Sequence, residues 1–147
     1  MQLRPYRSSD LSTLHEIDRA CFPPGIAYSR NELAGFITHR NSRTWVAEED
    51  GTAIGFVVAN RQTALVGHIV TLDVLESWRR HGVGTRLMDA AEAWARAQGL
   101  EMIYLETAED NVPAQQFYAG RGYSKSEKVE NYYASGIAAW VMVKGLR

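Results

Sequence analysis

Hydrophobic residues recur along the chain at two spacings, one typical of helices and the other of strands. Near the N-terminus they are spaced by three and four residues, which predicts an amphipathic helix capped by Ser9 or Asp10 and ended by Pro23. A second helix follows Ser29, which forms a capping box with Glu32. The apolar positions are Leu11, Leu14, Ile17 and Cys21 in the first helix, and Leu33, Phe36 and Ile37 in the second.

After the second helix the period becomes two, which is the period of β-strands. Asp50-Gly51 is a pair typical of tight hairpin turns, and it separates strands predicted over 44–49 and 52–61. A further strand is predicted over 64–74, so these three consecutive strands should form an antiparallel meander. A short strand is also predicted over 1–6.

A helical period returns after residue 82 and lasts until Gly99, which is placed to cap the helix at its C-terminal end. The next predicted strand, over 102–106, should be parallel to the strand over 64–74, because a helix connects the two. The outline is a mixed α/β fold with one central βαβ unit. The apolar stripe of its helix consists of Val83, Leu87, Ala90, Ala91 and Trp94. The remaining elements are a short helix over 111–119 that ends at Gly120, and strands over 123–129 and 137–144.

Composition narrows the classes of protein to which the chain can belong. We expect residues 1–147 to form a single domain with a core of ordinary size. The formal net charge of -1 argues against a general nucleic-acid surface, and no stretch reaches the roughly 20 apolar residues of a membrane span. The single cysteine, Cys21, excludes an intrachain disulfide and favours a reducing compartment. We therefore expect a cytoplasmic protein, a monomer or weak dimer, that binds neither nucleic acid nor membrane directly.

The junction between the strand over 64–74 and the helix after residue 82 is a candidate binding site. Its sequence is Arg79-Arg80-His81-Gly82-Val83-Gly84-Thr85. The two glycines let the backbone approach a ligand closely, and the first N–H groups of a helix are unpaired, so a phosphate can bind there. The P-loop motif does not match, because Gly84 is followed by Thr85-Arg86 rather than by a lysine. The dinucleotide fingerprint does not match either, because position 87 is Leu rather than Gly.

The pattern Arg79-x-x-Gly82-x-Gly84 resembles the pyrophosphate loop of the GNAT acetyltransferase superfamily, which holds acetyl-CoA. Within this superfamily the chain resembles the RimI-type ribosomal-protein N-terminal alanine acetyltransferases. The resemblance extends over nearly the whole chain, although that group more often has Trp where Tyr28 stands. The residues that carry it are Phe22-Pro23-Pro24, Tyr28-Ser29, Leu105-Glu106, Asn111, Ala114, Tyr118, Gly122-Tyr123 and Asn131-Tyr132-Tyr133.

The resemblance implies a fold, a reaction and a cosubstrate. The fold is α/β, with a mostly antiparallel sheet of about seven strands, a central splayed pair of parallel strands and about four helices. The reaction is acetyl transfer from acetyl-CoA to the α-amino group of a protein N-terminus, by direct attack in a ternary complex and without a metal. The implied acceptor is the N-terminal alanine of a small-subunit ribosomal protein. The residues expected to contact acetyl-CoA are Leu72, Asp73, Val74, Arg79, Arg80, His81, Gly82, Val83, Gly84, Thr85 and Asn111.

Two side chains are the candidate catalytic residues. The resemblance makes Tyr118 the general acid that protonates the departing thiolate, which suits a phenol with a pKa of about 10. It makes Glu106 the general base, and an α-amine with a pKa of about 8 needs a weaker base than a lysine side chain does. From the residues alone, Tyr118 is also readable as a half-buried helix tyrosine and Glu106 as a solvated residue at a strand end. His68 is a second candidate base, although a lone histidine on a strand is more often structural.

Four aromatic residues are candidates for the acceptor side. They would clamp a short peptide N-terminus, and the alternative is that they pack in the core of the last hairpin. Cys21 is expected to be a small core residue rather than an acyl-carrying nucleophile, because no activating base lies near it in the sequence. The four aromatic candidates are Phe22, Tyr28, Tyr132 and Tyr133.

Two alternative functions are compatible with the sequence. The pyrophosphate loop does not specify the acceptor, so a small-molecule amine or a lysine side chain is an alternative substrate. A non-catalytic CoA-binding or interaction module is the alternative from another class. Glu106, Asn111 and Tyr118 together argue against this module, because a pure binder needs neither an acid nor a base.

Overall fold

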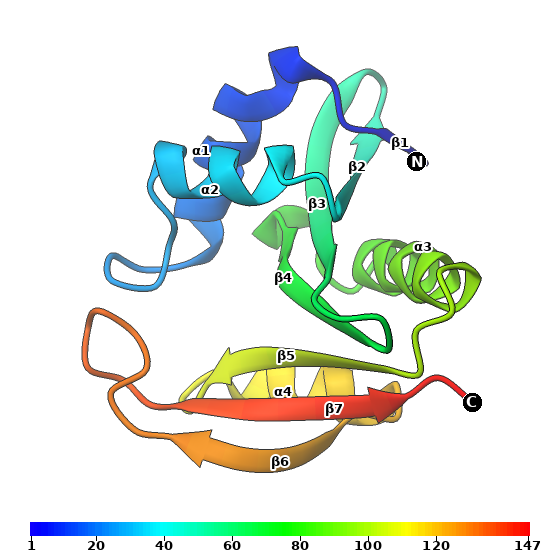
Figure 1. Ribbon diagram of the computed structural model, residues 1–147. Coiled ribbons are helices and arrows are strands. Elements are labelled where there is room, and N and C mark those ends of the chain that lie inside the picture. Colours follow the sequence, from blue (N-terminus) through cyan, green and yellow to red (C-terminus); the bar gives the residue numbers. More distant parts are fainter.

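The computed structural model describes residues Met1 to Arg147, with strands and helices in the predicted order (Figure 1). The strands are β1 (Gln2–Pro5), β2 (Ser42–Glu49), β3 (Thr52–Arg61), β4 (Val66–Val74), β5 (Met102–Ala108), β6 (Ser124–Val129) and β7 (Ala139–Gly145). The α-helices are α1 (Leu11–Cys21), α2 (Arg30–Thr38), α3 (Val83–Ala97) and α4 (Val112–Gly120). Two short 3-10 helices are η1 (Ser8–Asp10) and η2 (Glu76–Trp78).

All seven strands belong to one sheet, in the order β1-β2-β3-β4-β5-β7-β6. Every neighbouring pair is antiparallel except β4 and β5, which are parallel because α3 connects them. These two strands pair only over Val66–His68 and Met102–Tyr104. Beyond these residues β4 follows β3 to Val74, while β5 follows β7 to Ala108. The predicted sheet, with its central splayed parallel pair, is therefore confirmed.

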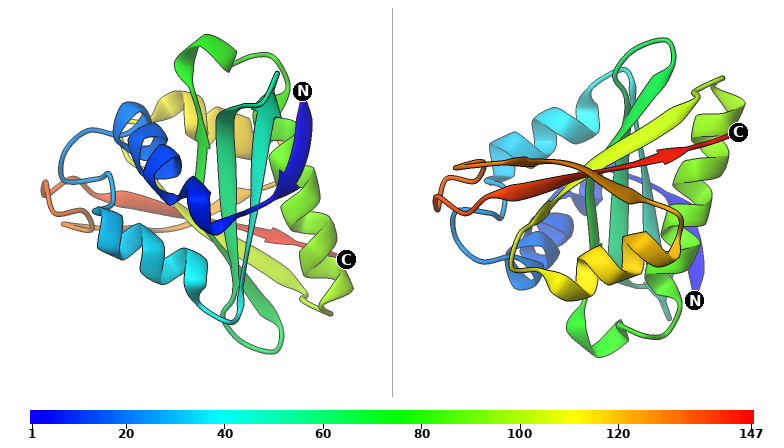
Figure 2. Two further views of the ribbon diagram at one scale, coloured as in Figure 1. Left: turned by 90° about the horizontal axis from the view of Figure 1, so that it is seen from above. Right: turned by 90° about the horizontal axis from the view of Figure 1, so that it is seen from below.

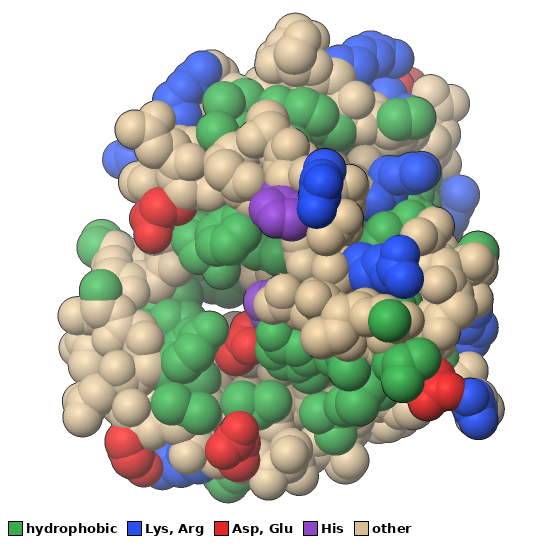
Figure 3. All heavy atoms as spheres, in the orientation of Figure 1, with side chains coloured by type: hydrophobic (Ala, Val, Ile, Leu, Met, Phe, Trp, Pro, Cys, Tyr) green, Lys and Arg blue, Asp and Glu red, His purple; other side chains and the backbone are tan.

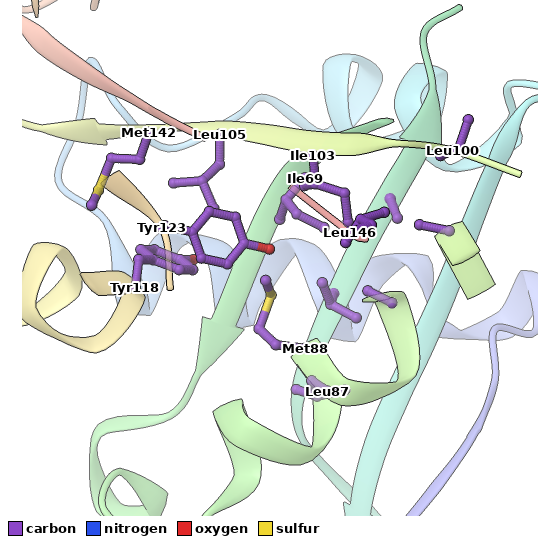
Figure 4. Packing of buried hydrophobic residues seen from close by; sticks show 14 of the residues in the cluster. Ile69, Leu87, Met88, Leu100, Ile103, Leu105, Tyr118, Tyr123, Met142 and Leu146 are labelled. Atoms are coloured by element: carbon purple, nitrogen blue, oxygen red, sulfur yellow. The ribbon is translucent and has the colours of Figure 1, made fainter. Parts of the chain in front are cut away.

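Helices cover both faces of the sheet (Figure 2). α1 and α2 pack on one face, over a buried cluster that includes Leu14 and Phe56. α3 packs on the other face, where a larger cluster extends to Tyr118 of α4 (Figure 4). Ile69 and Val70 belong to opposite clusters, as the alternation of side chains along a strand requires. None of the helices combines the length and the apolar character needed to cross a membrane.

Predicted caps are confirmed at three helix ends, whereas α1 begins after Asp10 without a side-chain capping bond. The Ser29 hydroxyl accepts the Glu32 N–H at 3.1 Å, and the Glu32 carboxylate accepts the Ser29 N–H at 2.9 Å, which completes the capping box of α2. The Asn111 side chain caps α4 by accepting the N–H of Ala114 at 3.2 Å. Gly99, after α3, has a φ of +79°, which is the left-handed conformation of a helix C-cap.

Some local predictions are wrong. Phe36 is 36% exposed rather than buried, and its ring packs edge-on against Tyr28, with 5.0 Å between ring centroids. By contrast, α4 ends at Gly120 as predicted, and Gly122 makes the turn that follows with a φ of +95°. Met88 belongs to the buried face of α3, which the predicted stripe did not include.

Candidate active site

The separation of β4 from β5 leaves part of the β4 backbone without a strand partner. The N–H of Leu75 donates to the Ile54 carbonyl at 3.0 Å, so Leu75 faces β3. Because backbone groups alternate along a strand, Val74 and Leu72 face the gap between β4 and β5. The Val74 carbonyl accepts Arg79 Nε at 3.1 Å. The N–H of Val74 and the peptide groups of Leu72 therefore face the gap as polar groups for a ligand.

Asp73 faces away from this gap. Its backbone lies opposite Phe56 in the β3–β4 ladder, and its side chain is fully buried. The carboxyl group accepts the Thr71 hydroxyl at 2.5 Å and lies towards Asp18 of α1. Asp73 is therefore separated from Leu72 and Val74, with which the sequence grouped it, because successive strand residues point to opposite sides.

The loop before α3 presents a row of unpaired donors. None of the six consecutive N–H groups from Arg80 to Thr85 donates a hydrogen bond within the protein, and the first helical bond runs from Arg86 to Gly82 at 3.1 Å. Arg80 and Gly82 have φ values of +65° and +79°, and such left-handed turns gather N–H groups into an anion-binding concavity. The start of a 15-residue helix adds its positive dipole end. This loop can bind a pyrophosphate through its backbone.

The side chains of the same loop have more limited roles. Arg79 folds back onto the Val74 carbonyl, and His81 packs edge-on against Trp78 with 5.5 Å between ring centroids. Gly84 faces α4, where an added Cβ would lie 3.4 Å from the Phe117 ring. The positive charge of Arg79 and Arg80 still lies beside the row of N–H groups, and it favours an anion there.

Glu106 and His68 are in hydrogen-bonding contact where β4 and β5 begin to separate. Glu106 Oε1 lies 2.7 Å from His68 Nε2, and both side chains are only partly exposed. The His68 ring stacks on Tyr104, with 4.4 Å between centroids and 17° between planes. His68 and Tyr104 are also the last paired residues of the two strands. A carboxylate in contact with an imidazole can accept a proton and share it with the ring.

Three of the four predicted acceptor-side aromatics lie around Glu106. Burial and then the charge of Glu106 raise the pKa of Tyr132 to about 12. Burial, then Tyr132 and Glu106, raise the pKa of Tyr28 and of Tyr133 above the ordinary value. The structure therefore brings together residues from the α1–α2 loop, β5 and the β6–β7 loop. Phe22 is half-buried at the end of α1, where its N–H donates to the Asp18 carbonyl at 3.0 Å.

Tyr118 lies inside the larger core, with a side chain only 7% exposed. Burial raises its pKa above 10, and the charge of Asp73 and the nearby Tyr133 raise it further. Its ring packs edge-on against Phe117 and Tyr123, with 5.2 and 5.6 Å between centroids. A tyrosine with a raised pKa remains protonated at neutral pH, so this hydroxyl is able to donate a proton.

α4 is attached to the end of β5 by a side chain that the sequence did not single out. Gln115 Nε2 donates to the carbonyls of Ala108 and Glu109, at 3.0 and 3.1 Å. The helix that carries Tyr118 and the strand that carries Glu106 therefore form one hydrogen-bonded unit.

Cys21 fits its expected packing role. Its Sγ donates to the Val74 carbonyl at 3.4 Å, and burial raises its pKa to about 11. A neutral thiol is a poor nucleophile.

Two loops enclose the acceptor side of the site. The α1–α2 loop and the β6–β7 loop meet at Gly25, where an added Cβ would lie 2.8 Å from Ser135 Cβ. Gly25 also has a φ of +89°, so both the contact and the backbone favour glycine. Figure 3 shows an opening in the surface that is bordered by hydrophobic, acidic and histidine side chains.

Some functional contacts were missed from the sequence. His68 was predicted as a second candidate base, but its direct contact with Glu106 was not predicted. The signal was present, because both residues lie on the strands that the βαβ unit places side by side. The contact of Asp18 with Asp73 had no sequence signal, because it depends on how α1 crosses the sheet.

The model of the acetyltransferase (GNAT) family matches residues 11–123. An uncharacterized N-acetyltransferase of Methanocaldococcus jannaschii is 31% identical over 145 residues, covering 98% of this chain and 91% of the relative. An N-alpha-acetyltransferase of Sulfurisphaera tokodaii is 29% identical over 160 residues, covering 99% of this chain and 93% of the relative. The chain belongs to the GNAT family of acetyltransferases, and it is an acetyl-CoA-dependent N-acetyltransferase.

Solved structures confirm the GNAT fold. Ard1 from Thermoplasma volcanium superposes with a TM-score of 0.89 at 24% identity, covering 98% of this chain and 96% of that one. The ribosomal-protein alanine N-acetyltransferase of Escherichia coli has a TM-score of 0.87 at 17% identity, covering 99% and 93%. Arabidopsis thaliana NAA60, in complex with acetyl-CoA, has a TM-score of 0.84 at 21% identity, covering 98% and 97%.

Proposed function

We propose that this enzyme acetylates the α-amino group of a protein N-terminus. The observation that carries the proposal is the enclosure of Glu106 by Tyr28, Tyr132 and Tyr133. These tyrosines belong to the two loops that meet at Gly25 and Ser135. Such an enclosure admits the end of an extended chain more readily than a side chain in the middle of one. The similarity to the N-alpha-acetyltransferase of Sulfurisphaera tokodaii over nearly the whole chain supports the same acceptor class.

The gap between β4 and β5 fits the cosubstrate. Acetyl-CoA supplies the acetyl group that is transferred. The six unpaired N–H groups from Arg80 to Thr85 would hold its pyrophosphate, and the backbone of Leu72 and Val74 would pair with the pantetheine amides. The Val74 N–H would also donate to the thioester carbonyl. Asn111, which caps α4, would contact the cosubstrate from the other side of the gap.

Two proton transfers involve residues of this chain. Glu106 accepts a proton from the attacking amine, directly or through water, and His68 at 2.7 Å can share that proton. Tyr118 holds the proton that the leaving sulfur takes, because its pKa is raised and the hydroxyl is protonated at neutral pH. The base lies on β5 and the acid on α4, so both are fixed on the same side of the gap.

The first residue of the acceptor would lie among Tyr28, Tyr132 and Tyr133, which surround Glu106. A small first side chain suits this aromatic enclosure. We therefore propose the N-terminal alanine of a small-subunit ribosomal protein as the acceptor, on the resemblance to the RimI-type group. The likeness to the Escherichia coli structure supports the same fold for that task.

The acceptor class can be tested by following thiol release from acetyl-CoA with matched peptides. One peptide begins with Ala-Arg and has a free N-terminus, and its control has a blocked N-terminus and one internal lysine. We expect kcat/KM for the first peptide to exceed that for the second, and that for a small-molecule polyamine, by at least about a hundredfold, as an α-amine and an enclosed site imply. Equal rates with the blocked lysine peptide would show that the acceptor class is wrong.

The catalytic roles can be tested with two variants whose new side chains have nearly the same shape as the original ones. We expect Tyr118→Phe and Glu106→Gln each to lower kcat by roughly a hundredfold, as the loss of a general acid or base does. The affinity for CoA, measured by calorimetry, should stay at the wild-type value in both variants. Full activity in both would contradict the assigned roles while leaving the acceptor class untouched.

A further inference from the structure

Two buried carboxyl groups lie behind the acceptor side, and the proton transfers above use neither. Asp18 of α1 and Asp73 of β4 are both 0% exposed, and Asp18 lies close enough to Asp73 to raise the pKa of its carboxyl group. Asp18 Oδ2 accepts the Tyr28 N–H at 2.8 Å, and Asp73 Oδ1 accepts the Thr71 hydroxyl at 2.5 Å. The two remaining oxygens, Asp18 Oδ1 and Asp73 Oδ2, have no donor in the protein.

One proton between these two oxygens explains the arrangement. Two buried carboxylates in contact cannot both be ionised, because burial and like charge both oppose the second charge. A shared proton satisfies both unpartnered oxygens and leaves the pair with a single negative charge. In agreement, burial and then Asp18 raise the pKa of Asp73 well above its ordinary value. The charge of Arg79 opposes this increase but has a smaller effect than burial and Asp18.

Apart from the charged Arg79, the groups that face the pair stay neutral near neutral pH. α1 contributes the Cys21 thiol, whose pKa burial raises to about 11, and α4 contributes the Tyr118 phenol, whose pKa is also raised. β4 contributes the hydroxyl of Thr71, which does not titrate. A pH dependence in this region would therefore come from the two aspartates themselves.

We propose that Asp18 and Asp73 share one proton and thereby hold Tyr28, on the acceptor side, in place against β4. We call this pair the Asp18–Asp73 latch. Tyr28 is attached at two points, because its N–H donates to Asp18 and its hydroxyl donates to the Val70 carbonyl at 3.4 Å. The inference rests on the proposed function, in which Tyr28 faces the acceptor. Asp18 and Asp73 are positioning residues, because they determine where Tyr28 lies without touching the reacting atoms.

The latch has a defined pH dependence. A group whose pKa is raised in the folded state stabilises that state at low pH, and its contribution is lost as the pH rises through the folded pKa. Loss of the shared proton leaves two like charges in contact, which pushes α1 away from β4 and withdraws Tyr28. Tyr28 is therefore held in place at pH values below this transition and released at pH values above it.

Substitutions at Asp18 distinguish the effect of its hydrogen bond with Tyr28 from the effect of the proton that it shares with Asp73. Asp18→Asn keeps an acceptor for the Tyr28 N–H and gives Asp73 a permanent donor, whereas Asp18→Ala removes both. We expect Asp18→Ala to raise the acceptor KM roughly tenfold or more, as loss of a hydrogen bond to a charged group implies, with kcat near the wild-type value. Asp18→Asn should restore the wild-type acceptor KM at neutral pH.

Asp10→Ala is the matched control, because Asp10 is another buried carboxylate at the start of α1 and pairs with Arg4. This variant should lower stability without changing the acceptor KM. If Asp18→Ala and Asp18→Asn give the same acceptor KM, or if Asp10→Ala raises it as much as Asp18→Ala does, the positioning role is wrong.

The pH profile tests the shared proton. The ratio of the wild-type acceptor KM to that of Asp18→Asn cancels the titration of the peptide amine itself. We expect this ratio to rise as the pH rises, because only the wild-type pair can lose its proton. A ratio that stays constant up to the alkaline limit of the fold would overturn the shared proton.

Amide hydrogen exchange of Tyr28, measured by NMR, tests the latch without any acetyl transfer. Protection should be lower in Asp18→Ala than in the wild type, and it should decrease with pH in the wild type more than in Asp18→Asn. If this holds while no peptide is acetylated, the latch stands and the proposed function is wrong. If peptides are acetylated but Asp18→Ala leaves the protection of Tyr28 unchanged, the latch is wrong.

Discussion

Glu106 and Tyr118 have opposite tasks in the proposed reaction, and their surroundings differ accordingly. Glu106 remains partly exposed and lies beside His68, so it can exchange a proton with the acceptor amine or with water. Tyr118 is enclosed by Phe117 and Tyr123, away from water. Burial disfavours the phenolate, so the environment of Tyr118 maintains the acid in its protonated form. In the proposed reaction the base is thus partly exposed to solvent, and the acid is shielded from it.

The raised pKa of Tyr118 predicts the alkaline limb of the rate profile. An ordinary tyrosine is half-ionised at a pH of about 10, and an enzyme that needs its proton would lose half its kcat there. Because the pKa of Tyr118 lies above 10, the proton is retained and we expect kcat to stay level up to a pH of about 10. The measurement is kcat at saturating peptide and acetyl-CoA, corrected for uncatalysed thioester hydrolysis. A fall with a midpoint at or below the ordinary value would show that Tyr118 is not the acid.

At the scale of elements, local signals predicted most of the architecture. Ser29, Asn111 and Gly99 mark helix ends through bonds and backbone angles that depend only on nearby residues, and these predictions are confirmed. The row of free N–H groups before α3 is likewise a local property of a loop that opens a helix. Phe36 was misplaced because helical spacing does not tell a core position from a rim position.

Contacts between elements that are distant in the sequence could not be predicted from local sequence signals. His68 and Glu106 are separated by 38 residues, and their contact depends on the register of two parallel strands. Asp73 was grouped with Leu72 and Val74 because a sequence pattern does not give the side to which a strand residue points. The splay and the catalytic roles came from the resemblance rather than from the hydrophobic pattern, because no composition or period signals a gap in a sheet.

The loop before α3 makes a prediction about cosubstrate binding. Gly82 has a φ of +79° and no atom within 4 Å of an added Cβ, so Gly82→Ala acts only through the backbone. An alanine in this conformation costs about 1 kcal/mol, which corresponds to roughly a fivefold increase in the KM for acetyl-CoA. Gly99→Ala is the matched control, because Gly99 has the same φ and the same free space at the other end of α3. It should lower stability by a similar amount and leave that KM unchanged, and equal KM effects in both variants would argue against a pyrophosphate site at Gly82.

At the scale of the whole molecule, the splay weakens the connection between two parts of the sheet. β1 to β4 form one part and β5 to β7 the other, and the two strands between them pair over only three residue pairs. The larger core continues across this junction, where Tyr123 lies near Leu105 and Met88 (Figure 4). A gap that receives a cosubstrate therefore requires other contacts to hold the two parts together.

Glu92 of α3 provides such a contact, and it gives a prediction about stability. Its side chain is 2% exposed, and it accepts Lys144 Nζ at 2.7 Å, Tyr123 Oη at 2.9 Å and Arg121 Nε at 3.4 Å, all from the part that contains β5 to β7. Glu92→Ala leaves these donors without their shared acceptor, so we expect the free energy of unfolding to fall by about 3 kcal/mol. Asp89→Ala is the control on the same helix, because Asp89 also pairs with Arg121 but is 64% exposed, and it should cost less than about 1 kcal/mol. Urea denaturation of the two variants measures both values, and equal losses would mean that the buried network does not join the two parts of the sheet.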